Sequence, residues 1–141
     1  MSRAGITDEQ KRALLEAAEK ARMHAYAPFS GYKVGAAILD KSGQVFAGCN
    51  VENSSYGLTI CAERNAIAAA VAADCKKPVA IVVVTSDGGM PCGSCRQVLV
   101  EFNPAMRVMV ATPGSIAKET DAAALLPDYF TLAPKFQPGG I

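Results

Sequence analysis

Apolar and polar residues follow each other along this chain first with the period of a helix and then in short runs typical of strands. Thr7 and Gln10 stand three residues apart at the start of the first pattern, which is the spacing of a helix capping box. The segment from there to about Ala25 predicts an amphipathic helix, because its apolar residues recur at helical intervals with charged residues between them. Those apolar residues are Leu14, Leu15, Ala18, Ala21 and Ala25.

Short apolar runs farther along the chain predict strands that alternate with helices. Residues 32–39 and 44–50 flank the turn-forming residues 41–43, which predicts a hairpin, and the β-branched run 79–85 is typical of a strand buried on both faces. We expect further helices at about 61–73, 92–102 and 121–126, and strands at 107–111 and 116–120. This order predicts one domain over residues 1–141, a three-layer α/β/α sandwich around a mixed five-stranded sheet, with a flexible tail from about residue 134.

Composition and charge exclude some classes of function. Half of the 141 residues are apolar and the formal net charge is only +1. The chain lacks the cluster of Lys and Arg that phosphate contacts require, so we expect no nucleic-acid partner. The first residues do not form the apolar core of a signal peptide, and the longest strongly apolar run, 79–84, is too short to span a bilayer. We therefore expect no membrane association and a cytoplasmic location.

Three of the five cysteines stand where two helices are predicted to begin. Cys61 precedes an alanine-rich helix with Glu63 two residues later, and Cys92 and Cys95 lie three residues apart behind Pro91. An odd number of cysteines outside a short secreted framework favours metal or catalytic use over disulfides. Three thiolates can hold Zn²⁺ tetrahedrally and leave its fourth position open, which is typical of a catalytic site. We therefore predict one zinc ion per chain, bound by these three cysteines.

The charge of such a centre sets expectations for its neighbours. Three thiolates and one Zn²⁺ sum to −1, which would weaken the metal as a Lewis acid. Two helix amino termini directed at the sulfurs would oppose this by about 0.3–1 kcal/mol each. Arg64 and Arg96 are candidates to donate hydrogen bonds to a thiolate, although each could instead lie on a solvated helix face. Cys49, Cys75 and the single histidine, His24, have no ligand partner at useful spacing and are expected to be structural.

Cys-Ala-Glu followed by Pro-Cys-x-x-Cys is the established three-cysteine pattern of zinc deaminases, and the chain resembles the small cytidine deaminases in their homotetrameric three-cysteine form. The resemblance covers nearly the whole chain. It implies a cytidine deaminase-like fold and hydrolytic deamination of cytidine and 2′-deoxycytidine to uridine and 2′-deoxyuridine with release of ammonia, in pyrimidine salvage. Apart from the zinc motifs it rests on matches in order at residues 26–30, 34–37, 48–53, 95–97 and 125–127.

Glu63 is the candidate catalytic residue in this reaction. A zinc-bound water can reach a pKa of roughly 7, and an adjacent carboxylate can take its proton and deliver it elsewhere. Zinc-bound hydroxide would attack C4 of cytosine while Glu63 protonates N3. Glu63 would then pass a second proton to the amine, which leaves as ammonia.

The resemblance also implies roles for residues outside the zinc motifs. Asn50 and Glu52 would bind the ribose, chiefly its 3′-hydroxyl, which fits a family that accepts both nucleosides. The backbone N–H of Ala62 would hold O2 of the base. Tyr32 stands where the family usually has a phenylalanine against the pyrimidine, so stacking is retained but the added hydroxyl needs a partner.

Two further aromatic residues are implied to complete the sites across subunits of a homotetramer. Tyr56 matches a residue that reaches a neighbouring subunit's site, and Phe130 matches one that stacks over the base from another subunit. Exposed aromatic rings at these places suit a monomer poorly unless another surface covers them. The alternative is that both rings pack in the core of their own subunit.

Two other functions remain open on the sequence. The chain could be a zinc deaminase of another small aminated substrate, such as a free base or an aminonucleoside antibiotic, although Asn50 and Glu52 point to a ribose. It could also be a structural zinc module that binds a partner protein, in which case changing Glu63 would cost no activity. Ammonia release from cytidine distinguishes these possibilities.

Overall fold

The computed structural model describes residues 5–136, 139 and 141. Its strands form the mixed five-stranded sheet that the sequence predicts, and η1 is a short 3₁₀ helix. The elements in chain order are α1 (Asp8–Arg22), β1 (Gly35–Asp40), β2 (Val45–Cys49), η1 (Tyr56–Leu58), α2 (Ala62–Ala72), β3 (Pro78–Val84), α3 (Gly93–Phe102), β4 (Arg107–Thr112), β5 (Ser115–Asp121) and α4 (Ala122–Leu125).

The strand order brings three loops to the same end of the sheet. The order is β2-β1-β3-β4-β5, and only the β3–β4 pair is parallel. Gly35 at the start of β1 pairs with Cys49 at the end of β2 and with Val84 at the end of β3. The loops before β1, after β2 and after β3 therefore meet at this end, and the last two lead into α2 and α3.

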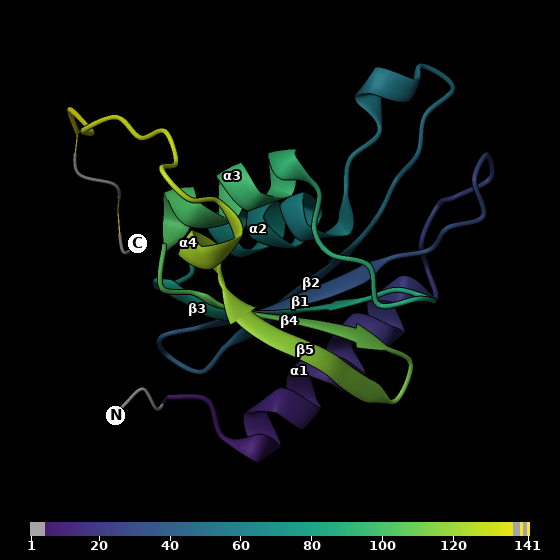
Figure 1. The fold of residues 1–141 in the computed structure, drawn as a ribbon, viewed down its shortest axis with the longest axis horizontal. Helices are drawn as coiled ribbons and strands as arrows, with labels where there is room; N and C mark the ends of the chain where they lie inside the picture. Colours follow the sequence, from purple (N-terminus) through teal and green to yellow (C-terminus); the bar gives the residue numbers. More distant parts are fainter. Residues whose placement is uncertain (1–4, 137–138, 140) are drawn as a thin grey trace.

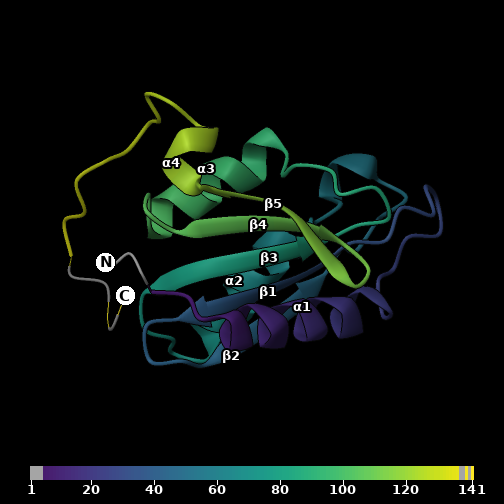
Figure 2. The same ribbon diagram turned by 60° about the horizontal axis from the view of Figure 1, so that its bottom comes forward.

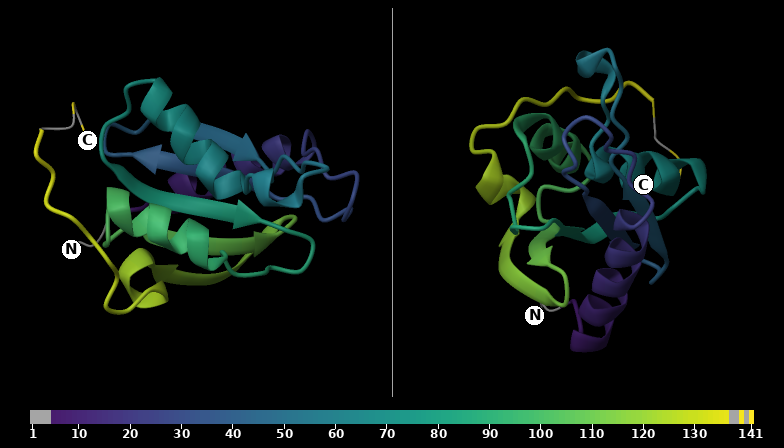
Figure 3. Two further views of the ribbon diagram at one scale, coloured as in Figure 1. Left: turned by 90° about the horizontal axis from the view of Figure 1, so that it is seen from above. Right: turned by 90° about the vertical axis from the view of Figure 1, so that its right-hand side faces the viewer.

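Helices cover both faces of the sheet, which gives the three predicted layers (Figures 1 and 2). α1 lies on one face, where Leu14 and Ala18 are fully buried in one core. α2 and α3 lie beside each other on the other face (Figure 3, left), where Ala66 and Leu99 belong to a second core. Successive residues of β3 enter the two cores in turn, as expected for a strand buried on both faces.

Two glycines in neighbouring strands allow the helices to lie directly on the sheet. A Cβ atom on Gly48 of β2 would lie 2.5 Å from the backbone nitrogen of Ala66 in α2, and one on Gly35 would lie closer still to the carbonyl of Ala18 in α1. Backbone atoms cannot yield at such separations without moving the helix. Gly48 therefore helps to set the distance between α2 and the sheet, and the first turn of α2 carries Glu63.

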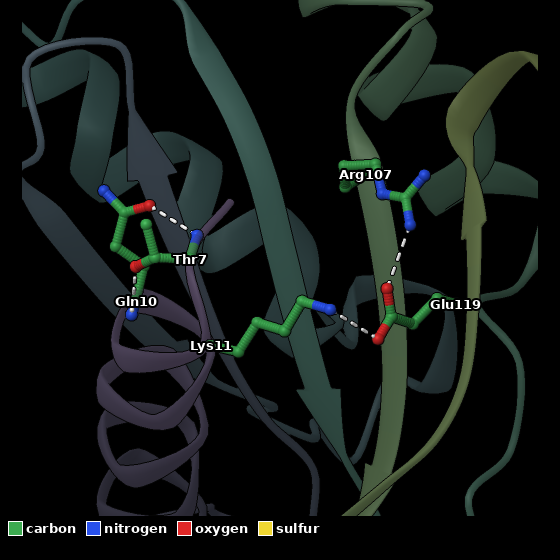
Figure 4. A network of polar contacts seen from close by, with 5 residues as sticks. All are labelled: Thr7, Gln10, Lys11, Arg107 and Glu119. Atoms are coloured by element: carbon green, nitrogen blue, oxygen red, sulfur yellow. Dashed lines mark hydrogen bonds and ion pairs between the residues drawn. The ribbon is translucent and has the colours of Figure 1, made fainter. Parts of the chain in front are cut away.

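The capping box at the start of α1 is confirmed (Figure 4). The Thr7 hydroxyl accepts a hydrogen bond from the Gln10 N–H, and the Gln10 side-chain oxygen accepts one from the Thr7 N–H, each at 3.0 Å. Close by, Lys11 of α1 and Arg107 of β4 both contact the carboxylate of Glu119 in β5 at 2.9 Å. These pairs join three elements, but they are partly exposed and each contributes modestly to stability.

The predicted boundaries differ most on either side of the loop that precedes β1. The first helix ends at Arg22 and not near Ala25, and the first strand begins at Gly35 and not at residue 32. The reason is a contact distant in sequence. The Tyr26 N–H donates to the Asn50 carbonyl at 3.0 Å and the Tyr26 carbonyl accepts from the Glu52 N–H at 2.8 Å, so this backbone follows the loop after β2.

The predicted flexible tail lies in part, at 137–138 and 140, outside the described residues. Within the described ranges, no helix combines the length and the apolar character needed to cross a membrane.

Candidate metal centre and active site

The three cysteines predicted to bind zinc converge between α2 and α3. Cys61 is the N-cap of α2, Cys92 is the N-cap of α3, and Cys95 lies in the first turn of α3. Their sulfur atoms all lie within 4.8 Å of one another, and the Cys61 and Cys92 sulfurs are 3.9 Å apart. All five cysteines are free thiols, so no disulfide competes for these atoms.

The donor set fits zinc. Thiolates that bind zinc tetrahedrally at about 2.3 Å lie roughly 3.8 Å from one another, close to the separation of the Cys61 and Cys92 sulfurs. Among the residues that the structure describes, no fourth histidine, cysteine or carboxylate joins the group. Three protein ligands with a free fourth position are the arrangement of a catalytic zinc site.

Neighbouring groups favour the thiolate form of Cys61. Hydrogen bonds from Cys95, Arg64 and Cys92 lower the pKa of Cys61 to about 5, with Cys95 contributing most. The hydrogen bond to Cys61, followed by burial, raises the pKa of the Cys95 thiol in turn. A low pKa eases the loss of the proton that a metal ligand must give up.

The two arginines that follow the ligands behave differently. Arg64 Nη2 lies 3.6 Å from the Cys61 sulfur, so this candidate does donate to a thiolate. Arg96 instead donates to the carbonyl of Pro91 at 2.8 Å and to that of Leu125 at 3.0 Å. Its guanidinium therefore ties the loop before Cys92 to the C-terminal helix α4.

Glu63 is buried in the first turn of α2, two residues after Cys61. Only 5% of its surface is exposed, and burial raises the pKa of its carboxyl to about 7, with the charge of Cys61 adding to the rise. A carboxyl group with a pKa near neutrality can both accept and donate a proton at physiological pH. This is the property required of a residue that carries protons between water and a substrate.

Asn50 and Glu52 are buried and organise the loop before β1. The Asn50 side chain donates to the Tyr32 carbonyl at 2.8 Å and accepts from the Val34 N–H at 2.9 Å. The Glu52 carboxylate accepts from the Phe29 N–H at 2.9 Å and from the N–H and hydroxyl of Ser30. Hydrogen bonds, chiefly that from the Ser30 hydroxyl, lower the pKa of Glu52 and keep it ionised.

The Tyr32 hydroxyl has a partner that the sequence did not reveal. It donates to Asp87 Oδ1 at 2.7 Å, across 55 positions of the chain. Burial is the main cause of the raised pKa of the Tyr32 phenol, and the hydrogen bond to Asp87 and the negative charges of Asp87 and Glu63 add to the rise. Asp87 lies in the turn-like sequence Asp87-Gly88-Gly89, and no motif marked it as functional.

The comparison with known proteins identifies the family. The family model "Cytidine and deoxycytidylate deaminase zinc-binding region" matches residues 8–112. The chain belongs to this family. It is 43% identical over 121 residues to a cytidine deaminase of Sporosarcina psychrophila, and this alignment covers 84% of this chain and 89% of the relative. It is 44% identical to a cytidine deaminase of Halalkalibacterium halodurans, over 86% of this chain and 94% of the relative.

Solved structures of cytidine deaminases share the fold of this family member. The crystal structure of cytidine deaminase from Burkholderia pseudomallei aligns with a TM-score of 0.79 at 49% identity and covers 84% of this chain and 98% of its own. That of cytidine deaminase from Mycobacterium tuberculosis aligns with a TM-score of 0.78 at 38% identity, over 89% and 99% of the two chains. The predicted sandwich and the predicted zinc-binding family are thus both confirmed.

The remaining predicted site residues of this deaminase-family chain are the buried Ala62 and two exposed aromatic residues, Tyr56 and Phe130. Ala62 is buried at the first position of α2, where a backbone N–H has no acceptor within the helix. Tyr56 and Phe130 are 70% and 67% exposed, so neither ring packs in the core of its own chain. Tyr56 opens η1 in the loop between β2 and α2, which projects away from the sheet (Figure 1). The Phe130 carbonyl accepts from Gln97 Nε2 of α3 at 3.0 Å.

Proposed function

We propose that this chain is a zinc-dependent cytidine deaminase that converts cytidine and 2′-deoxycytidine to uridine and 2′-deoxyuridine with release of ammonia. One observation carries the proposal: three free cysteine sulfurs within 4.8 Å of one another lie beside the buried carboxyl of Glu63. The similarity to proteins named cytidine deaminase over more than four fifths of the chain supports the choice of substrate.

The residues divide the reaction between them. Cys61, Cys92 and Cys95 would hold the zinc, which supplies Lewis acidity and a nucleophilic water at neutral pH when bound. The Glu63 carboxyl delivers a proton to N3 of the base, which makes C4 electrophilic. It then moves a proton to the 4-amino group, which leaves as ammonia, so that one water is consumed for each uridine formed. A pKa of about 7 suits Glu63 to both transfers.

The substrate is held by the residues around this centre. We assign O2 of the base to the Ala62 N–H, and the 3′-hydroxyl of the sugar to Asn50 and Glu52. Both side chains are less than a tenth exposed and are already fixed by backbone hydrogen bonds, so their polar atoms are positioned before substrate arrives. Such preorganisation reduces the entropy lost on binding. Tyr32 provides the aromatic wall beside the base.

Replacing Glu52 with glutamine should weaken the binding of cytidine and deoxycytidine alike. The amide loses the charge and one acceptor oxygen, and a hydrogen bond to a charged group is worth about 1.5–3 kcal/mol, so we expect KM to rise roughly ten- to hundredfold for both substrates. KM for each nucleoside and the thermal stability of the variant are the measurements. A loss confined to cytidine would place the contact at the 2′-hydroxyl and contradict the assignment.

We further propose that the active species is a cytoplasmic homotetramer of single-domain chains that acts in the salvage of pyrimidine nucleosides. The exposure of Tyr56 and Phe130 supports an assembly in which these rings reach the site of another subunit. Leu58 and Leu132, close to them in sequence, are 65% and 73% exposed. Apolar side chains exposed in this number are typical of a surface that another molecule covers.

Mixing two inactive variants tests the shared sites. Chains with Glu63→Gln and chains with Phe130→Ala should regain part of the activity when reassembled together, because some sites then combine an intact Glu63 from one chain with an intact Phe130 from another. Reassembly of Glu63→Gln with Cys92→Ala chains is the matched control and should regain nothing, since both residues belong to the same chain's part of the site. Sedimentation of the active enzyme as a monomer would overturn the proposal.

Ammonia release from cytidine by the purified zinc-loaded chain is the direct test of the function. Release from cytidine and deoxycytidine, with none from cytosine, is the expected result. Turnover of cytosine or of an aminonucleoside antibiotic in place of cytidine would indicate a deaminase of another substrate. Bound zinc without any ammonia release would indicate a structural zinc module.

A further inference from the structure

The phenol of Tyr32 makes a hydrogen bond that connects the loop before β1 to the loop after β3, at the active end of the sheet. Tyr32 lies in the loop before β1, and Asp87 lies in the loop that leads from β3 to Cys92 and α3. The hydroxyl donates to Asp87 Oδ1 at 2.7 Å, and this bond lowers the pKa of Asp87 so that the acceptor is a carboxylate. Hydrogen bonds to ionised acceptors are stronger than those between neutral groups.

The Asp87 carboxylate is itself held by its own loop. Its Oδ1 atom also accepts from the Gly89 N–H at 3.1 Å and from the Thr85 hydroxyl at 3.2 Å. The Thr85 oxygen accepts in turn from the N–H groups of Gly88 and Gly89, at 2.7 and 3.0 Å. Thr85 is buried directly after β3, so the acceptor for the phenol is fixed to the sheet.

The main chain of Tyr32 is fixed by the residues assigned to the sugar. Its N–H donates to the Ser30 hydroxyl at 2.9 Å, which donates to the Glu52 carboxylate, and its carbonyl accepts from Asn50 at 2.8 Å. With the backbone held at both ends, the hydroxyl bond determines where the ring lies. Gly89 leaves room for it, since a Cβ atom there would lie 2.9 Å from the Tyr32 hydroxyl oxygen.

We propose that Asp87 is a positioning residue for substrate binding: by accepting the hydrogen bond of the Tyr32 phenol it holds the aromatic ring in place as a rigid wall for the base of the nucleoside. The proposal rests on the proposed function, because the base is the ligand that the ring contacts. Asp87 acts only through Tyr32 and takes no part in proton transfer. Its removal should therefore affect substrate affinity more than the chemical step.

Kinetics of variants at the two positions test this role. Tyr32→Phe keeps the ring but frees it, and Asp87→Ala removes the acceptor. Each should raise KM for cytidine about three- to tenfold, as expected for a partly exposed hydrogen bond to a charged group, and should change kcat by less than about threefold. Asp87→Asn retains an oxygen that accepts from the phenol, so it should keep KM within about twofold of the parent.

A double-mutant cycle separates the proposed link from two independent effects. Asp87→Ala should raise KM clearly in the parent and much less in the Tyr32→Phe chain, because the bond is already absent there. Tyr26→Phe, which removes a phenol from an exposed residue of the same loop, is the matched control and should leave KM unchanged. Zinc content should stay at one per chain throughout, because Thr85 still holds the loop before Cys92.

Three results would overturn the proposal: full additivity of the two changes, an unchanged KM in Asp87→Ala, or loss of zinc from Asp87→Ala. An Asp87→Asn chain as impaired as Asp87→Ala would also count against it, because the acceptor oxygen would then be irrelevant. Failure of the proposed function would look different, since the parent chain itself would release no ammonia from cytidine.

Discussion

Replacing Cys92 with alanine is expected to release zinc and abolish deamination. The Cys92 sulfur is one of only three protein donors brought together among the described residues, so its loss leaves two ligands. Changing a residue that merely supports a ligand already costs about 10–100-fold in metal affinity, and loss of a ligand should cost more. We expect zinc per chain to fall from about one to near zero after dialysis, and ammonia release to disappear with it.

Cys49→Ala is the matched control for this loss. Cys49 is a free thiol at the end of β2, outside the cluster of three sulfurs, so its replacement should leave zinc content and activity near those of the parent. A Cys92→Ala chain that keeps a full complement of zinc would show that the metal is held elsewhere. Parent protein without zinc after growth in zinc-replete medium would contradict the metal centre itself.

The metal centre could be predicted from the sequence because its spacing is local. Cys92 and Cys95 lie within one helical turn behind a proline, and Cys61 and Glu63 lie at the start of another helix, so each half needs only its own helix to form. The two halves meet because the loops after β2 and β3 leave the same end of one sheet and lead into α2 and α3. The zinc ion and its catalytic use could be predicted from the ligand types, since three thiolates and a carboxylate have few other uses at such spacing.

Contacts between loops distant in sequence could not be predicted in the same way. The bond from Tyr32 to Asp87 spans 55 positions, and the bonds that the loop before β1 donates to Glu52 span 22 and 23. No periodicity or motif encodes which loops meet, because the meeting depends on strand order. This also explains why the first helix ends early: the backbone at Tyr26 pairs with residues after β2 and does not continue the helix.

Arg96 shows how a residue next to a ligand can find a partner that the sequence does not indicate. Its place directly after Cys95 left two outcomes open, a bond to a thiolate, as found for Arg64, or a solvated helix face. Arg96 donates instead to the carbonyls of Pro91 and Leu125. The direction of a side chain on a helix depends on what packs beside it, and here α4, whose arrival next to α3 no local pattern predicts, provides the acceptor.

Glutamine in place of Glu63 should reduce the rate of deamination by about 10²–10⁴-fold while zinc and fold are retained. The amide has nearly the shape of the carboxyl but cannot accept a proton and pass it on. Because Glu63 is 5% exposed and its pKa is raised to about 7 by burial, its ionised form is costly to bury, and a neutral amide avoids that cost. The variant should therefore be at least as stable as the parent in thermal unfolding.

Single-turnover measurement of ammonia release by the Glu63→Gln chain, with zinc determined in the same sample, checks this expectation. Glu101→Gln makes the same chemical change on the exposed face of α3 and should leave the rate unchanged. Because the substitution removes proton transfer and spares the groups assigned to the sugar, the affinity for uridine should change far less than the rate. A Glu63→Gln chain that turns over cytidine at nearly the parent rate would mean that another group carries the protons.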